Sequence, residues 1–137
     1  MPPGSGHGAY LAAFERVVLP AVQGFEPQLI VVASGFDASG DDPLGRMQCY
    51  NETYREMTLM LKSVAQELCE GRLVACHEGG YSPRYVPFCA LATIETLAGI
   101  RTEVDDPRGG DISSYGGQSL QPHQEEIIAK AQQMISP

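Results

Sequence analysis

Two short runs of consecutive apolar residues stand out along the chain, at residues 29–34 and 73–76. Each run has the length of a strand, and neither shows the alternation of polar and apolar residues that marks a strand with one side in water. Continuous apolar runs are typical of parallel strands that are covered on both faces. We therefore predict two buried parallel strands.

The segment between these runs predicts an amphipathic helix. Asn51 is predicted as its N-cap, Glu52 suits the first turn, and Gly71 suits the C-terminal stop. Its apolar side chains recur at helical spacing: Tyr54, Met57, Leu61, Val64, Ala65 and Leu68. A strand, a helix and a second strand make a βαβ unit, so the predicted fold class is α/β, a parallel sheet with flanking helices.

Three further helices are predicted from the same spacing. One covers residues 8–23, and Pro20 should bend or shorten it because proline lacks a backbone N–H. Another runs from Pro87 to Ala98, where Gly99 and Ile100 resemble a Schellman ending. The third follows Pro122, after a stretch at 101–119 that is rich in Asp, Gly and Ser and is predicted as a long loop. The predicted apolar faces of the first and last helices are Tyr10, Phe14, Val17, Val18 and Ala21, and Ile127, Ile128, Ala131, Met134 and Ile135.

The predicted sheet is incomplete. Two buried parallel strands with both edges open do not make a stable sheet. Either further strands are missing from this chain, or a partner supplies them.

Length, charge and cysteine spacing narrow the class of protein. The chain has 137 residues and a formal net charge of −8, without a basic stripe, which argues against nucleic-acid binding. An acidic surface suits cationic substrates, but it is also common for solubility. No apolar run is long enough to span a membrane and no signal peptide is visible, so we expect a cytoplasmic location and no membrane partner. The cysteines form no C-x-x-C pair and are expected to be reduced and mostly buried.

Residues that could take part in catalysis or metal binding follow directly after the two predicted strands. Parallel strands end at the same edge of a sheet, and ligands of open α/β sheets bind beyond that edge. Asp37 and Tyr81 should therefore emerge side by side. Asp37 is either a metal ligand or base, or an aspartate that caps a turn. Tyr81 is either a donor to a developing oxyanion, or a half-buried tyrosine that packs at a helix start. Spacing alone favours the structural role for each.

Other polar residues nearby are predicted to have structural roles. Asp41 and Asp42 are expected to cap turns. His77 is expected to be a hydrogen-bonded structural histidine, whereas His7 and His123 lie in loop-like settings with no evident partner.

Two motifs carry a resemblance to a known family. Residues 34–45 read SGFDASGDDPLG and residues 78–81 read EGGY. In this order and spacing they resemble the signatures of the histone deacetylase superfamily, in particular class II-like bacterial histone-deacetylase-like amidohydrolases and acetylpolyamine amidohydrolases. The segments at 82–89 and 2–6 are similar to the same bacterial proteins.

The resemblance implies an arginase-like or deacetylase-like α/β fold and a zinc-dependent reaction. Asp37 matches a zinc ligand, and Tyr81 matches the tyrosine that polarises the acetyl carbonyl. Leu44 matches a residue that lines the acyl pocket, and Gly80 matches a glycine beside it. The implied reaction hydrolyses an acetylated amine, such as acetyl-lysine or an acetylpolyamine, to acetate and a free amine, with Zn²⁺ as the cofactor.

The chain also departs from the family pattern. The other two zinc ligands of the family, in an Asp-x-His motif, and its histidine pair do not occur in this sequence. Residues 1–137 are therefore expected to be the C-terminal portion of a deacetylase catalytic domain whose N-terminal half is absent, and to be inactive alone. Two alternatives remain: a noncatalytic remnant or interaction module that keeps the scaffold, and an unrelated α/β domain, which would require Asp37 and Tyr81 to lie far apart.

Overall fold

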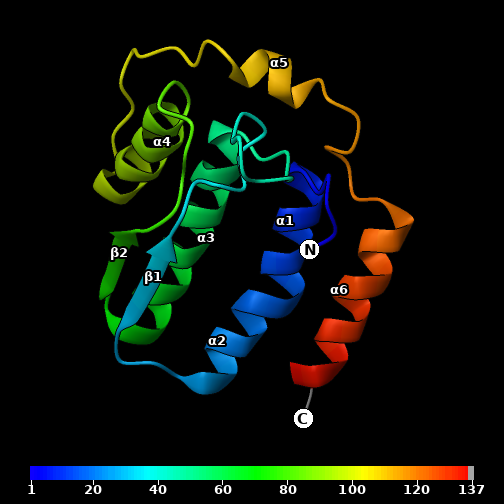
Figure 1. Cartoon of the computed structure of the whole chain (residues 1–137). Helices are drawn as coiled ribbons and strands as arrows, with labels where there is room; N and C mark the ends of the chain where they lie inside the picture. Colours follow the sequence, from blue (N-terminus) through cyan, green and yellow to red (C-terminus); the bar gives the residue numbers. More distant parts are fainter. Residues whose placement is uncertain (136–137) are drawn as a thin grey trace.

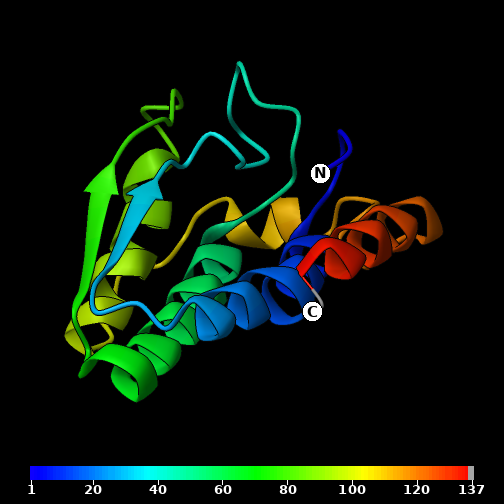
Figure 2. The same cartoon turned by 90° about the horizontal axis from the view of Figure 1, so that it is seen from below.

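A computed structural model of the chain describes residues 1–135. Helices gather on one side of a pair of strands, and the long loops extend from one end (Figures 1 and 2). Of the described helices, none is both long and apolar enough to cross a membrane. The elements in chain order are α1 (His7–Ala13), the π-helical turn η1 (Phe14–Val18), α2 (Leu19–Phe25), β1 (Ile30–Ser34), α3 (Asn51–Cys69), β2 (Leu73–His77), α4 (Val86–Ala98), α5 (Gly109–Ser113) and α6 (Pro122–Ile135).

The two strands pair as predicted, but they are not covered on both faces by the described residues. β1 and β2 are parallel, with Ile30 opposite Leu73 and Ser34 opposite His77. Along β1 the burial alternates, because every second side chain faces the helices and the others face away. Val31 and Val74, which are partners across the sheet, are 61% and 47% exposed. The prediction of strands buried on both sides is therefore wrong for the part of the chain that the structure describes.

Helix α3 crosses from β1 to β2 and differs from the prediction at its start. Tyr50, not Asn51, is the N-cap, and its backbone N–H donates to Thr53 Oγ1 at 3.3 Å. Asn51 is the first helical residue, and its side-chain oxygen accepts the N–H of Glu52 at 2.8 Å. The helix stops where predicted, as Glu70 (φ 55°) and Gly71 (φ 78°) take left-handed conformations.

The first predicted helix is divided by a π-helical turn rather than shortened. η1 ends two residues before Pro20, and the wider turn accommodates the missing N–H of that proline. The extra residue of the turn shifts by one position the residues of α2 that face the core. Val22 and Leu19 pack against the buried cluster around Val64, whereas Ala21, predicted on this face, is exposed.

The C-terminal third contains more structure than predicted. Helix α4 ends as expected, with Gly99 at φ 70° and the Ile100 N–H donating to Glu95 O at 3.0 Å. The segment at 101–119, predicted as a loop, contains the helix α5. The sequence does not reveal this helix, because five residues are too few to show helical periodicity. In α6, Ile128 is buried, but Ile127 and Met134 are 44% and 85% exposed, so their predicted burial is wrong.

The main buried cluster lies between α1, α3, α4 and α5. Fully buried side chains from separate segments meet there: Cys49, Tyr85, Cys89 and Ile112. The Tyr85 hydroxyl donates to Asp106 at 2.8 Å and accepts the Asn51 N–H at 3.2 Å, which ties the segment before α5 to the start of α3. Three of the four cysteines are buried, as expected, and Cys76 is exposed.

An ion pair joins α3 to α4 inside the structure. Arg55 donates to Glu95 at 2.7 Å, and the Glu95 side chain is only 3% exposed. Glu95 also accepts the N–H and the hydroxyl of Thr102. The hydrogen bonds from Thr102, together with Arg55, lower the pKa of Glu95 to about 2.

We expect Ile112→Ala to destabilise the chain by roughly 2–5 kcal/mol, because it leaves a cavity at a fully buried site. Chemical denaturation measures this change. Ile100→Ala is the matched control, since Ile100 is 59% exposed and should cost less than about 0.5 kcal/mol. Equal losses in both variants would show that α5 does not pack as described.

We expect Glu95→Gln to make the free energy of unfolding depend less on pH in the acid range. The folded pKa of Glu95 lies below its ordinary value of 4.5, so its contribution is present above that value and is lost as the pH falls toward about 2. Free energies of unfolding of wild type and variant should therefore converge across this range. Profiles that stay parallel would contradict the assignment.

Candidate active site

The loops that follow β1 and β2 are joined beyond the ends of the strands. The N–H of Phe36 donates to Gly79 O at 2.8 Å, and the N–H of Glu78 donates to Ser34 O at 3.2 Å. Asp37 comes one residue after this junction on the first loop, and Tyr81 comes two residues after it on the second. The sequence prediction that both loops share one edge of the sheet is therefore confirmed.

Two glycines allow this close approach. A side chain at Gly79 would collide with the carboxylate of Asp37. Gly80 has φ +130°, and a Cβ there would lie 2.9 Å from Val86 and 3.1 Å from Phe36. Any larger residue would force the second loop away from Asp37.

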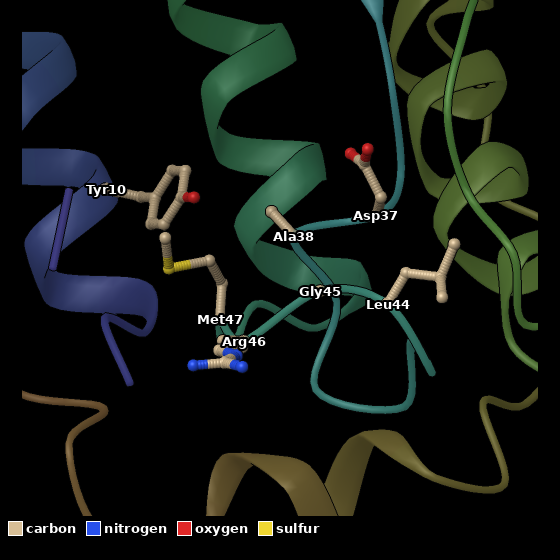
Figure 3. A pocket seen from close by; sticks show the side chains of 7 residues that line it. All are labelled: Tyr10, Asp37, Ala38, Leu44, Gly45, Arg46 and Met47. Atoms are coloured by element: carbon tan, nitrogen blue, oxygen red, sulfur yellow. The ribbon is translucent and has the colours of Figure 1, made fainter. Parts of the chain in front are cut away.

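The Asp37 carboxylate lines a hollow of about 300 Å³ between the first loop and α1 (Figure 3). In Figure 3, the hydroxyl of Tyr10 points from α1 toward the middle of this hollow, whereas the side chain of Leu44 turns away from Tyr10. Leu44 is 71% exposed. The residues around the hollow are Tyr10, Asp37, Ala38, Leu44, Gly45, Arg46 and Met47.

Tyr10 is a site residue that sequence reasoning missed. Its helical spacing predicts a place on the apolar face of a helix, and its ring does pack against the main cluster. Burial, with smaller effects of Cys49 and Asp37, raises the pKa of Tyr10, which keeps its hydroxyl protonated. Only its position opposite Asp37, which the sequence does not reveal, marks it as part of the site.

Asp37 does not cap a turn. Within residues 1–135, the side-chain hydrogen bonds at this edge of the sheet go to Asp41 and Asp42, and none goes to the Asp37 carboxylate. Asp37 is exposed, so its charge faces the open side of the edge. This favours a ligand or base over the structural alternative.

Asp42 caps the turn as predicted and also reaches the second loop. Its Oδ1 accepts the N–H groups of Leu44 and Gly45, at 2.9 and 2.8 Å, and its Oδ2 accepts the N–H of Tyr81 at 2.7 Å. Burial acts to raise the pKa of Asp42, but these three backbone donors outweigh it and hold the pKa below its ordinary value. Asp41 pairs with Arg108 at 3.0 Å and accepts the Ser82 hydroxyl at 2.7 Å.

The Tyr81 side chain is 53% exposed, so it does not pack as a half-buried tyrosine at a helix start. Its phenol makes no hydrogen bond to the described residues, and Tyr81 is not among the residues that line the hollow around Asp37. A carboxylate and a phenol, neither of which has a hydrogen-bond partner among the described residues, thus belong to adjacent loops at one edge of the sheet.

Residues 1–97 match the family profile of the histone deacetylase domain. The chain belongs to the histone deacetylase family. It is 58% identical over 105 residues to a histone deacetylase-like amidohydrolase of Pseudomonas aeruginosa, covering 77% of this chain and 28% of that protein. It is 38% identical over 117 residues to histone deacetylase 15 of Arabidopsis thaliana, covering 85% of this chain and 20% of that protein.

The fold agrees with solved deacetylase structures. The structure of the histone deacetylase Clr3 superimposes with a TM-score of 0.72 and 28% identity, over 98% of this chain and 21% of that one. The crystal structure of the HDA15 HD domain gives a TM-score of 0.66 and 30% identity, over 98% of this chain and 36% of that one. The chain thus has a deacetylase-like α/β fold and spans roughly a fifth to a third of these relatives.

The histidines of this deacetylase-family chain differ from the sequence predictions. His77 is exposed, and its ring contacts Phe36 (ring centroids 5.4 Å apart) instead of making a hydrogen bond to the described residues. His7 does have partners, since its Nδ1 lies 3.1 Å from Thr53 Oγ1 and its Nε2 lies 3.7 Å from a Glu56 oxygen. His123 lies in the first turn of α6 rather than in a loop.

The described residues do not form a complete catalytic zinc site. Residues 1–135 contain no group of three or more His, Cys, Asp or Glu side chains placed to hold a metal ion. A catalytic zinc uses about three protein ligands. The Asp37 carboxylate is a donor of the kind that zinc accepts, but no second and third side chain of this kind accompany it within residues 1–135.

We expect the 137-residue chain alone to bind zinc weakly, with the same stoichiometry in wild type and Asp37→Asn. Metal analysis after equilibrium dialysis tests this. Cys76→Ser serves as a control, because an exposed thiol can capture zinc adventitiously. One tightly held zinc that disappears in Asp37→Asn and persists in Cys76→Ser would overturn the prediction.

Proposed function

We propose that this chain supplies two groups to the active site of a zinc-dependent deacetylase. The substrate class is an acetylated amine, either acetyl-lysine or an acetylpolyamine, which is hydrolysed to acetate and a free amine. The observation that supports this most directly is that Asp37 and Tyr81 lie on adjacent loops whose backbones are joined by the Phe36–Gly79 hydrogen bond.

The proposed role of Asp37 is to serve as a metal ligand. Its carboxylate is exposed and accepts no hydrogen bond from the described residues, so both oxygens are available to a cation. Because the described residues supply one ligand only, zinc dependence is a proposal for the whole protein. The remaining ligands would have to come from outside residues 1–135.

The proposed role of Tyr81 is to stabilise the oxyanion. When water adds to an amide carbonyl, negative charge develops on the carbonyl oxygen, and a phenol can donate a hydrogen bond to it. Tyr81 suits this role because its side chain is largely exposed and its backbone is held by Asp42. A donor that is already in position needs little reorganisation during the reaction.

Leu44 and Gly80 are proposed to shape the substrate pocket in different ways. Leu44 presents an exposed apolar side chain at the rim of the hollow that contains Asp37. Gly80 acts through its lack of a side chain, which lets the Tyr81 loop lie against Phe36.

A noncatalytic module that keeps the deacetylase scaffold is the second candidate. The observation that favours it is the absence of a three-ligand metal group among residues 1–135.

The cytoplasmic location expected from the sequence stays a prediction.

A chimaera separates these two functions. We would replace the matching segment of the Pseudomonas aeruginosa amidohydrolase with this chain and measure zinc content, melting temperature and deacetylation of an acetyl-lysine reporter and an acetylpolyamine. We expect an active enzyme. Asp37→Asn should lose zinc together with activity, because it removes a charged ligand. Tyr81→Phe should keep zinc and stability but lose about 10²–10³ in kcat, the usual cost of removing one oxyanion donor.

Two variants serve as controls in the chimaera. Glu78→Gln removes an exposed carboxylate from the same edge of the sheet, and Tyr50→Phe removes a phenol hydroxyl elsewhere. Both should stay near the activity of the parent chimaera. A folded chimaera without activity would favour the noncatalytic module, and full kcat in Tyr81→Phe would refute the role of Tyr81.

A further inference from the structure

We propose that Asp42 is the positioning residue of this site, fixing the Tyr81 loop and the Leu44 loop against each other through a single carboxylate. The structural part of this inference concerns the two loops, and its catalytic consequence rests on the proposed function of Tyr81.

The two oxygens of the Asp42 carboxylate accept hydrogen bonds from different loops. Oδ1 accepts the N–H groups of Leu44 and Gly45, two and three residues along the chain, whereas Oδ2 accepts the N–H of Tyr81, which is 39 residues away. All three distances lie between 2.7 and 2.9 Å, the range of charge-assisted hydrogen bonds. One ionised side chain therefore joins the proposed pocket wall to the proposed oxyanion donor.

Tyr81 lies between a buried residue and a glycine: Ser82 after it is 3% exposed and donates to Asp41, whereas restraints on the side of the strand are few. Pairing between the two loops reaches Phe36 and Gly79, and only Gly80 then separates this junction from Tyr81. Glycine has few conformational restrictions of its own, so the local sequence alone does not fix the direction in which the chain leaves the junction. The Tyr81 ring is too exposed for packing to orient it. The direction of the phenol therefore depends on its backbone, which Asp42 holds.

The neighbouring carboxylate has a different task. Asp41 accepts the Ser82 hydroxyl, but it also pairs with Arg108 at 3.0 Å and its side chain is 8% exposed. Asp41 thus anchors the second loop to the segment at α5, whereas Asp42 links that loop to the rim of the hollow.

The chemistry of the side chain predicts which substitutes fail. A carboxylate has two acceptor oxygens, whereas an Asn amide has one oxygen and an NH₂ group that is itself a donor. Asp42→Asn can satisfy the Leu44 and Gly45 donors or the Tyr81 donor, but not both sets. Asp42→Glu keeps both oxygens and the charge but moves them by one methylene, so it distinguishes geometry from charge.

The first experiment uses the 137-residue chain and requires no catalysis. Amide hydrogen exchange is followed by NMR in wild type, Asp42→Asn, Asp42→Glu and the exposed control Asp105→Asn. In both Asp42 variants, at least one of the two donor sets should exchange about tenfold faster or more, as expected for the loss of a hydrogen bond to a charged group. The amides of Val64 and Ala65 in the buried part of α3 should stay unchanged, which separates loop release from unfolding.

The second experiment places Asp42→Asn in the chimaera. We expect kcat to fall about tenfold or more while KM and zinc content stay near those of the parent, because Tyr81 acts on the transition state. A general structural defect would instead lower the melting temperature and the zinc content. Asp105→Asn should change none of these quantities.

The outcomes distinguish the two proposals. If Tyr81, Leu44 and Gly45 exchange as slowly in Asp42→Asn as in wild type, the positioning role is refuted whatever the activity. If the loops are released but the folded parent chimaera is inactive, the proposed function fails and the structural link stands. If the loops are released and kcat stays unchanged in an active chimaera, Asp42 holds the loops without positioning a catalytic group, and the inference is overturned.

Discussion

The parallel pairing of β1 with β2 is the constraint on which the rest of this structure depends. The register that sets Ser34 opposite His77 also fixes which residues lie just beyond the strands. The Phe36–Gly79 hydrogen bond extends the pairing past the sheet and brings Asp37 to the loop that carries Tyr81. A slip of one residue would turn the side chains of a strand to the opposite face and separate these groups. The site is therefore a product of the strand register.

Elements with a strong local pattern can be predicted from the sequence. The two strands follow from short continuous apolar runs, α3 from its helical spacing, and the end of α4 from Gly99. α5 could not be found, because five residues show no period and its place depends on Ile112 reaching a distant cluster. Regular helical spacing predicts the wrong face for Ala21, because a π-helical turn shifts the phase of a helix without a clear signal in the sequence.

The candidate site was predictable where a motif marks it and not where tertiary contacts create it. Asp37 and Tyr81 follow strands directly, so strand polarity alone places them together. Tyr10 enters the site from α1, and Asp42 bonds to a residue 39 positions away, so neither role can be derived from local spacing. The partners of His7, Thr53 and Glu56, likewise belong to α3, so these contacts depend on the packing of α1 against α3.

The π-helical turn η1 makes the length of this segment as important as its composition. Each residue of an α-helix turns the chain by about 100°. A π-helical turn holds one residue more than the α-helical turn it replaces, so it shifts by one the sequence positions that face the core. Deleting one residue within Phe14–Val18 would restore a regular helix and leave Leu19 and Val22 facing the cluster at Val64, but the backbone around Pro20 would lose the wider turn that accommodates it. The extra residue and the proline therefore depend on each other, so relatives that keep a proline here should also keep the spacing between α1 and β1.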